Sequence, residues 1–167
     1  MAKKIASWKC KGVFLKLDIS RAFDSLSWPF LFEVLKAKGF GQRMITWLSI
    51  LLQIASTRIL VNGTPGRSII HAQGLKQGDP ISPLLFVVTM DALTTTVTRA
   101  SEVGVLNFFR GISAAQRISI YDDDVAFFIR PTLQDLLFVR EALLVFGSAS
   151  GLKVNYAKST TTVIRGN

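Results

Sequence analysis

The chain has 167 residues, of which 49% are hydrophobic, and its 20 Lys and Arg against 11 Asp and Glu give a net charge of +9. A single cysteine excludes an internal disulfide, a single histidine leaves almost no room for a zinc site of the usual ligands, and no apolar run reaches the about 18 residues of a membrane span. The basic excess favours a nucleic-acid partner, although composition alone fits a basic protein without one equally well.

The first half of the chain is expected to mix strands with helices. In chain order we expect a strand over 12–19, helices over 21–26, 28–38 and 42–54, and a hairpin of strands over 57–62 and 67–72. Ser20 and Ser27 are the predicted N-terminal caps of the first two helices, because a serine hydroxyl can accept a hydrogen bond from a free backbone N–H. The stretch 63–66, Gly-Thr-Pro-Gly, is the predicted turn of the hairpin.

The second half begins with a glycine-punctuated loop over 74–80. Beyond it we expect a helix over 82–100, a tight hairpin of strands over 118–121 and 125–129, a helix over 131–150, and short strands over 152–156 and 160–164. The chain has no repeat, linker or low-complexity tract, so a single domain over residues 1–167 is predicted. Because strands and helices lack regular βα alternation, we predict an α+β fold with an antiparallel sheet and helices packed on one face.

Three adjacent aspartates, Asp122, Asp123 and Asp124, form the tip of the second predicted hairpin. One interpretation is an ordinary turn, since acidic residues tolerate turn backbone. Adjacent carboxylates repel one another, however, and Asn-Gly would form a plain turn at lower cost. The pattern therefore favours a site for a divalent cation with hard oxygen ligands, such as Mg²⁺.

A further carboxylate, Asp18, lies at the end of the first predicted strand. If that strand and the hairpin are neighbours in one sheet, Asp18, Asp123 and Asp124 converge. Such a set can hold two Mg²⁺ ions, one activating an attacking hydroxyl and one neutralising a leaving pyrophosphate. In the loop, Gly78 would let backbone approach a base pair or nucleotide, and Gln77 would offer a donor and an acceptor. Taken singly, each feature has an ordinary structural explanation, because an Asp at a strand end is usually a turn residue.

Four motifs follow one another along the chain: residues 16–24 (KLDISRAFD), 74–86 (GLKQGDPISPLLF), 121–124 (YDDD) and 150–159 (SGLKVNYAKS). Together they cover nearly the whole chain, so jointly they are far more specific than any one of them. In this order they resemble the motifs of the palm of reverse transcriptases, and they are most similar to those of plant LINE-type (non-LTR) retrotransposons.

The resemblance implies a metal-binding role for four of the matched positions. Asp18 and Asp123 would hold two Mg²⁺ or Mn²⁺ ions, with Asp124 as a less essential third carboxylate. The backbone carbonyl of Ile19 would complete the coordination of the second ion. The resemblance thus implies a two-metal nucleotidyl transfer.

The resemblance also implies contacts with the nucleotide and the template. Phe23 would be the aromatic plate that rejects a ribose 2′-hydroxyl, although without the resemblance it is an ordinary core residue. Gln77 and Gly78 would contact the incoming nucleotide and the template, and Tyr121 belongs to the same group. Lys158 would protonate the leaving pyrophosphate, and the alternative is a solvated surface lysine.

The implied partners are an RNA template, a DNA primer and deoxynucleoside triphosphates, with no membrane. The sequence departs from the family pattern at Asp122, which stands where the family usually has Ala. The residues before Asp18 are too few for complete fingers, and the chain ends before a thumb. We therefore expect a palm core from a longer polyprotein, the rest of which is missing, or a gene remnant.

The leading hypothesis is an RNA-directed DNA polymerase domain that is inactive in isolation because it is truncated. The alternative is a non-catalytic, retrotransposon-derived nucleic-acid-binding or interaction domain. Intact Asp18, Asp123 and Asp124 favour the first, whereas the truncation and Asp122 favour the second. A palm-type RNA-dependent RNA polymerase or nucleotidyl cyclase is disfavoured because Phe23 occupies the plate position.

Overall fold

The computed structural model describes residues 11–121 and 123–164. Their backbone divides into two compact units, one formed by the chain up to Ser20 and from Met90 onward, and the other by Arg21–Thr89. The predicted single domain over residues 1–167 stays a prediction. No helix within the described ranges combines the length and the apolar character that crossing a lipid bilayer requires.

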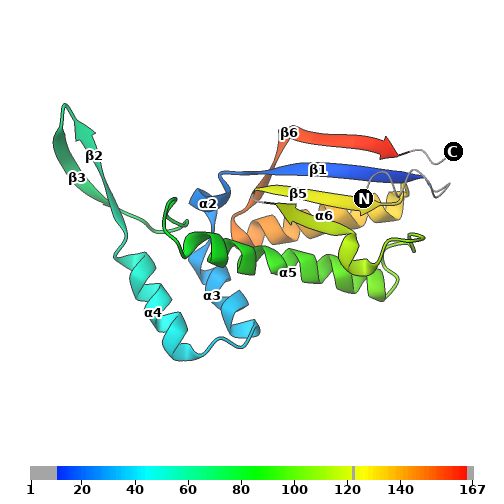
Figure 1. The fold of residues 1–167 in the computed structure, drawn as a ribbon, viewed down its shortest axis with the longest axis horizontal. Coiled ribbons are helices and arrows are strands. Elements are labelled where there is room, and N and C mark those ends of the chain that lie inside the picture. The colour runs from blue at the N-terminus through cyan, green and yellow to red at the C-terminus, as the bar shows by residue number, and fades with distance from the viewer. Residues whose placement is uncertain (1–10, 122, 165–167) are drawn as a thin grey trace. The chain divides into compact units, whose positions relative to one another are not determined.

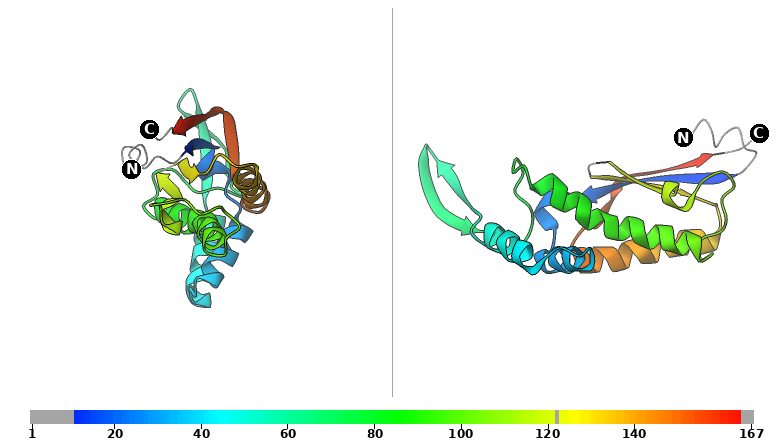
Figure 2. Two further views of the ribbon diagram at one scale, coloured as in Figure 1. Left: turned by 90° about the vertical axis from the view of Figure 1, so that its right-hand side faces the viewer. Right: turned by 60° about the horizontal axis from the view of Figure 1, so that its bottom comes forward.

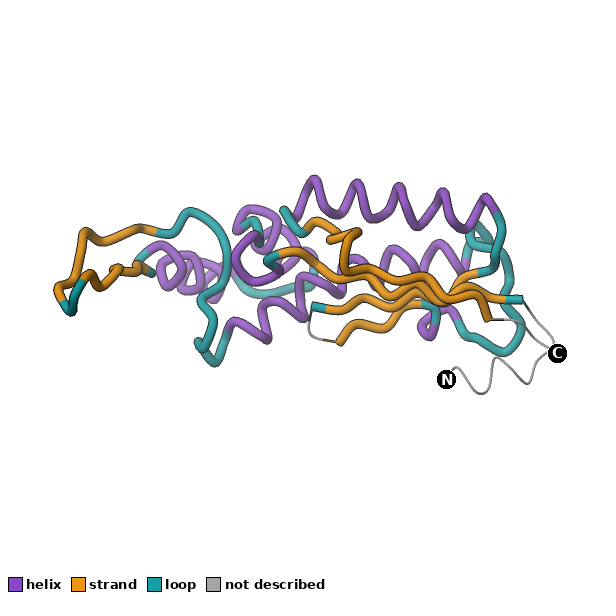
Figure 3. The backbone as a smooth tube through the Cα atoms, turned by 90° about the horizontal axis from the view of Figure 1, so that it is seen from above, coloured by secondary structure: helices purple, strands orange, loops and turns teal. Residues whose placement is uncertain are grey.

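The first unit is built on a four-stranded antiparallel sheet. Its strands are β1 (Gly12–Ser20), β4 (Ile118–Tyr121), β5 (Asp124–Ile129) and β6 (Lys153–Ile164), and they lie in the order β4-β5-β1-β6 (Figures 1 and 3). Helix α6 (Leu133–Ser150) and the part of α5 (Ser82–Glu102) from Met90 onward run along one side of this sheet (Figure 2). This arrangement confirms the predicted α+β fold.

Alternation along the strands sorts the side chains of this sheet between two faces. On β5, Val125, Phe127 and Ile129 are all 0% exposed and belong to the core. The core also contains alternate residues of β1 and the inner faces of the two helices: Val13, Leu17, Ile19, Met90, Leu93, Val97, Val139, Leu143 and Phe146. The intervening residues of β1, among them Lys16 and Asp18, therefore lie on the opposite face.

One end of that opposite face is covered by an aromatic cluster. The rings of Phe14 and Phe128 lie 5.0 Å apart at 44°, and Phe109, Ile112 and Ile164 pack around them. This cluster covers the start of β1 and does not extend to its end. The uncovered end is where the sequence places its carboxylates.

A buried polar network fastens the N-terminal end of α6 to the preceding loop. Asp135 is 0% exposed and accepts hydrogen bonds from Asn107 Nδ2 at 2.7 Å, Thr132 Oγ1 at 3.1 Å and the backbone N of Arg130 at 3.2 Å. The Arg117 guanidinium, 2% exposed, lies 3.6 Å from the same carboxylate and donates to the Asn107 carbonyl at 2.6 Å. A buried charge pair with this many hydrogen bonds is expensive to break from one side.

The second unit contains the first part of α5, up to Thr89, together with three shorter helices and a two-stranded hairpin. These are α2 (Ala22–Ser25), α3 (Trp28–Ala37), α4 (Gln42–Gln53), β2 (Ser56–Val61) and β3 (Thr64–Ile70). Ser27 caps α3 as predicted, accepting from Phe30 N at 3.5 Å. The prediction that Ser20 caps α2 is wrong, because Ser20 still belongs to β1. The N-cap is Arg21, which has a left-handed backbone (φ 48°) and makes no side-chain cap bond.

The predicted turn over residues 63–66 is also wrong. The turn is Asn62-Gly63, whose φ angles of 51° and 80° are both positive, as a type I′ turn requires. Residues 64–66 continue as the start of β3, in which Thr64 faces Val61 and Pro65 faces Leu60. Asn-Gly is a strongly preferred pair for this turn type. The prediction overlooked it because the adjacent Gly-Thr-Pro-Gly stretch also contains turn-forming residues.

The two short strands predicted near the C-terminus are one strand. β6 runs without a break from Lys153 to Ile164, but its pairing with β1 shifts where the gap was predicted: Lys16 faces Thr160, while Asp18 faces Asn155. Ser159 holds this irregular stretch, donating to the Asn155 carbonyl at 2.7 Å. The predicted interruption is therefore a bulge within a strand.

The polar network gives a stability prediction. Asp135→Ala should lower the free energy of unfolding by about 3–5 kcal/mol, because Arg117 would be left buried without its partner. The matched control is Glu141→Ala, which breaks an exposed pair with Arg140 at 2.7 Å and should cost at most about 1 kcal/mol. Urea denaturation measures both, and equal losses would contradict the account.

Candidate active site

Two of the predicted carboxylates face each other across the sheet. Asp18 on β1 and Asp124 on β5 are register partners, so their side chains leave the sheet on the same face. Like charges directly opposite in an antiparallel pair are destabilising. A positive charge near this end of the sheet would offset that repulsion.

The turn between β4 and β5 lies beside this pair. Tyr121 is the register partner of Asp124 and is 83% exposed. Asp122 lies outside the described residues. Asp123 is exposed in the turn, and its carbonyl accepts a hydrogen bond from Ile19 N at 3.0 Å. This bond ties the turn to the end of β1.

The cation beside these carboxylates is Lys16. It lies two residues before Asp18 on the same face of β1, and its Nζ is 2.6 Å from Asp124 Oδ2. The hydrogen bond and charge of Asp124 raise the pKa of Lys16, and the charges of Asp123 and Asp18 add to this effect. The ammonium therefore stays protonated and acts on all three carboxylates.

The donor set has the right chemistry for a hard divalent cation. Carboxylate and carbonyl oxygens are the ligands that Mg²⁺ prefers, and Asp18, Asp123 and Asp124 supply them. Within residues 11–121 and 123–164, however, no three Asp, Glu, His or Cys side chains are gathered closely enough to hold a metal ion. The Asp124 carboxylate is instead engaged by Lys16.

The bulge of β6 reaches the same corner through Ser159. Its hydroxyl accepts a hydrogen bond from the backbone N of Asp18 at 3.3 Å. Lys158 precedes it and is exposed. Among the described contacts, none joins Lys158 to the three carboxylates, so its catalytic role stays a prediction.

In the second unit, the glycine-punctuated loop is fastened to α2. Leu75 N donates to the Phe23 carbonyl at 2.6 Å, and Trp28 Nε1 donates to the Gly74 carbonyl at 2.7 Å. The Phe23 ring stacks on Phe86 of α5 with centroids 5.0 Å apart. Phe23 is thus held at the base of the loop.

Gln77 and Gly78 lie further along this loop, and both are exposed. Gly78 has a φ of +85° with nothing within 4 Å of the position a Cβ would take. Gly74 has a φ of +82°, and a Cβ there would lie 2.5 Å from the Asp24 carbonyl oxygen. Gly74 is therefore needed for close approach as well as for backbone conformation.

The predicted site residues thus fall into two groups. Asp18, Ile19, Tyr121, Asp123 and Asp124 come together in the first unit. Lys158 also belongs to the first unit, without a described contact to them, whereas Phe23, Gln77 and Gly78 belong to the second unit.

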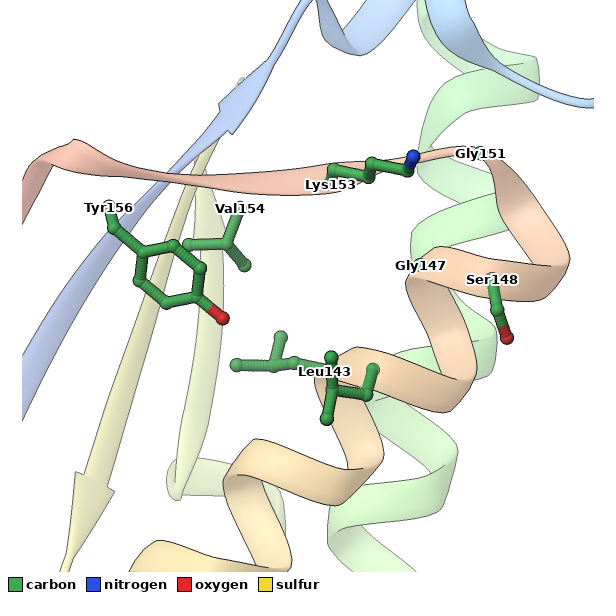
Figure 4. Close-up of a pocket in the computed structure, with 8 residues that line it drawn as sticks. Leu143, Gly147, Ser148, Gly151, Lys153, Val154 and Tyr156 are labelled. Atoms are coloured by element: carbon green, nitrogen blue, oxygen red, sulfur yellow. The ribbon is translucent and has the colours of Figure 1, made fainter.

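An apolar pocket of about 560 Å³ lies elsewhere in the first unit, between α6 and β6. Figure 4 shows Leu143 of α6 and Tyr156 of β6 facing it. Its lining contains none of the predicted site residues: Leu143, Leu144, Gly147, Ser148, Gly151, Lys153, Val154 and Tyr156.

Two residues that contact the carboxylates Asp18 and Asp124 were given no role in the sequence analysis. They are Lys16 and Ser159. A signal for Lys16 was present, because residues two apart on a strand share a face. No comparable signal existed for Ser159. Its contact with Asp18 depends on the bulge, which only the paired strands reveal.

Comparison with known proteins gives the chain a family. Residues 2–164 match the family model of reverse transcriptase (RNA-dependent DNA polymerase). The chain is 33% identical over 150 residues to the Pol polyprotein of the type-2 retrotransposable element R2DM of Drosophila melanogaster, covering 90% of this chain and 14% of the relative. It is 35% identical over 113 residues to the Pol polyprotein of the type-1 retrotransposable element R2 of Nasonia vitripennis, covering 63% and 11%. The chain thus spans a small part of these relatives.

The fold is similar to that of solved telomerases. The structure of Candida tropicalis telomerase in complex with a fragment of telomeric RNA superposes with a TM-score of 0.68 over 97% of this chain and 28% of that chain. At 13% sequence identity this likeness concerns the fold alone. It confirms the predicted palm.

The loop yields a paired prediction. Gly74→Ala should destabilise the chain by about 3 kcal/mol or more, since the left-handed backbone costs roughly 1–2 kcal/mol and the Asp24 backbone must also move. Gly78→Ala carries only the first of these costs. Thermal or urea unfolding separates them, and a Gly78 variant that is as unstable as the Gly74 variant would refute the close-approach argument.

Proposed function

The chain belongs to the reverse transcriptase (RNA-dependent DNA polymerase) family, and from this membership we propose that it is the palm domain of an R2-like retrotransposon enzyme. Its reaction would be template-directed transfer of a deoxynucleotide to a primer 3′-hydroxyl. The observation that carries the proposal is the facing pair Asp18 and Asp124, joined to the Asp123 turn through Ile19. A plant origin of the element is supported only by the resemblance of the motif sequences.

We propose that Asp18 and Asp123 hold two Mg²⁺ or Mn²⁺ ions, with Asp124 as the third carboxylate and the Ile19 carbonyl as a further oxygen. When bound, such ions supply Lewis-acid activation and charge neutralisation for phosphoryl transfer. The chain's own contribution is to hold these oxygens together at the end of the sheet and in the adjoining turn. The buried side chains of β5 and the Ile19–Asp123 hydrogen bond support that role.

The second unit would select the nucleotide. We propose that Phe23 excludes the ribose 2′-hydroxyl and that Gln77 and Gly78 contact nucleotide or template. Tyr121, which belongs to the first unit, is proposed to contact nucleotide or template as well. The stacking of Phe23 on Phe86 supports the proposed role of Phe23, because it keeps the ring from turning aside. Lys158 is the proposed proton donor to pyrophosphate.

The proposed partners are an RNA template, a DNA primer, deoxynucleoside triphosphates and the remainder of a longer polyprotein. The net charge of +9 suits a phosphate backbone. The small share of the relatives' length that the chain spans supports a need for further segments. Those segments would align primer and triphosphate, and positioning of this kind supplies about 7–11 kcal/mol of a barrier in favourable cases.

A second candidate function is nucleic-acid binding without catalysis. It is favoured by the engagement of Asp124 with Lys16 and by the lack of a gathered metal cluster among residues 11–121 and 123–164. A binding domain of this charge would bind with little sequence preference, and its affinity would fall steeply with salt.

Primer extension tests the proposal. The chain alone should bind a primed RNA template in a salt-dependent way without extending it, and adding the flanking segments of an R2 polyprotein should restore extension. Asp123→Asn should abolish the restored activity, whereas Glu141→Gln, an exposed change on α6, should not. Equal activity of both variants would reject Asp123 as a catalytic residue, whereas failure of the flanking segments to restore any extension would favour the binding domain.

Sugar selection gives an independent prediction in the same restored assay. Phe23→Val should raise ribonucleotide incorporation relative to deoxynucleotide by about tenfold or more, because steric discrimination of one small group has that size. Phe32→Val on α3 is the matched control. Unchanged selection by the Phe23 variant would make this ring a core residue only.

A further inference from the structure

Lys16 is a positively charged side chain that contacts one carboxylate of the site, Asp124, and lies near the charges of Asp18 and Asp123. It forms its 2.6 Å contact with Asp124 Oδ2, and its β1 neighbour on the same face is Asp18. Its own register partners are Ala126 on β5 and Thr160 on β6, neither of which is charged. The ammonium therefore has the carboxylate end of the sheet as its partner.

The contact is a diagonal cross-strand pair. Asp124 faces Asp18, and Lys16 lies two residues before Asp18 on β1, opposite Ala126. A diagonal neighbour is about 7–8 Å away at the backbone, a separation that a lysine side chain spans. The lysine thus reaches Asp124 from the side away from the turn that carries Asp123.

We propose that Lys16 is a positioning residue that holds the Asp124 carboxylate away from the divalent cation and leaves Asp18 and Asp123 as the pair that binds it. This inference rests on the proposed function, because it assumes that cations bind at this corner. In this arrangement the charge of Asp124 is neutralised by Lys16 rather than by a bound cation.

Two physical consequences follow from this arrangement. The lysine offsets the repulsion between Asp18 and Asp124, so the apo sheet can pair to its end. It also places a half-exposed positive charge beside the proposed cation site, which weakens cation binding. Both effects need a side chain that is charged and long enough, so arginine should substitute for lysine and methionine should not.

Mn²⁺ binding to the 167-residue chain, measured by electron paramagnetic resonance titration, tests the proposal without relying on activity. Lys16→Met should tighten binding by up to about fivefold, the range that loss of one exposed ion pair allows. Lys16→Arg should stay near wild type. The matched control is Lys36→Met, which removes the same charge from an exposed pair with Glu33 at 2.8 Å on α3 and should change nothing.

A double-mutant comparison separates direct from long-range effects. Asp124→Asn should weaken Mn²⁺ binding at least threefold more in the Lys16→Met background than in the wild type, because only the freed carboxylate becomes a ligand. An equal effect in both backgrounds, or no gain in Lys16→Met, would overturn the inference while leaving the cation site intact. If Asp123→Asn also binds Mn²⁺ like wild type, the proposed cation site itself fails, and the inference falls with it.

Discussion

The pairing of β1 with β5 is the constraint on which the site depends. The buried side chains Val125, Phe127 and Ile129 fix its register, because a slip of one residue would turn them all to the other face. The same register places Asp18 directly opposite Asp124. The hydrophobic core thus enforces a repulsive contact at the end of the sheet, and sequences keep such conflicts mainly at functional sites.

The two hairpins among the described residues show how unusual the carboxylate end of this sheet is. The β2–β3 hairpin turns at Asn62-Gly63, where both residues have positive φ and no charge is present. The β4–β5 hairpin has aspartates at its tip, and its Asp123 carbonyl binds the end of β1. The β2–β3 hairpin therefore forms its turn without the charge repulsion that the aspartates cause in the β4–β5 hairpin. The difference is explained if the carboxylates serve a cation.

Much of this arrangement was predictable from the sequence. Runs of apolar and β-branched residues located β1, β4 and β5. The position of Asp18 at a strand end suggested that it would meet the hairpin if the two strands were neighbours in one sheet. The motif resemblance added roles for Phe23 and Gln77, which periodicity alone could not assign.

The features that escaped prediction depend on contacts between distant segments. Ser159 reaches Asp18 only because β6 bulges as it pairs with β1. Ser20 does not cap α2 because it is still part of β1, where it pairs with Lys153 of β6, and Arg21 is the N-cap residue. The close approach of Gly74 to Asp24 likewise follows from the folding of a loop onto a helix.

The central claim is that Asp18 and Asp123 hold a divalent cation at the end of this sheet. Anomalous scattering from a crystal of the chain grown with Mn²⁺ tests it most directly. The account predicts an anomalous peak bounded by the carboxylates of Asp18 and Asp123, and its loss in Asp123→Asn. Saturating Mn²⁺ with no peak at these carboxylates, or the same peak in Asp123→Asn, would contradict it.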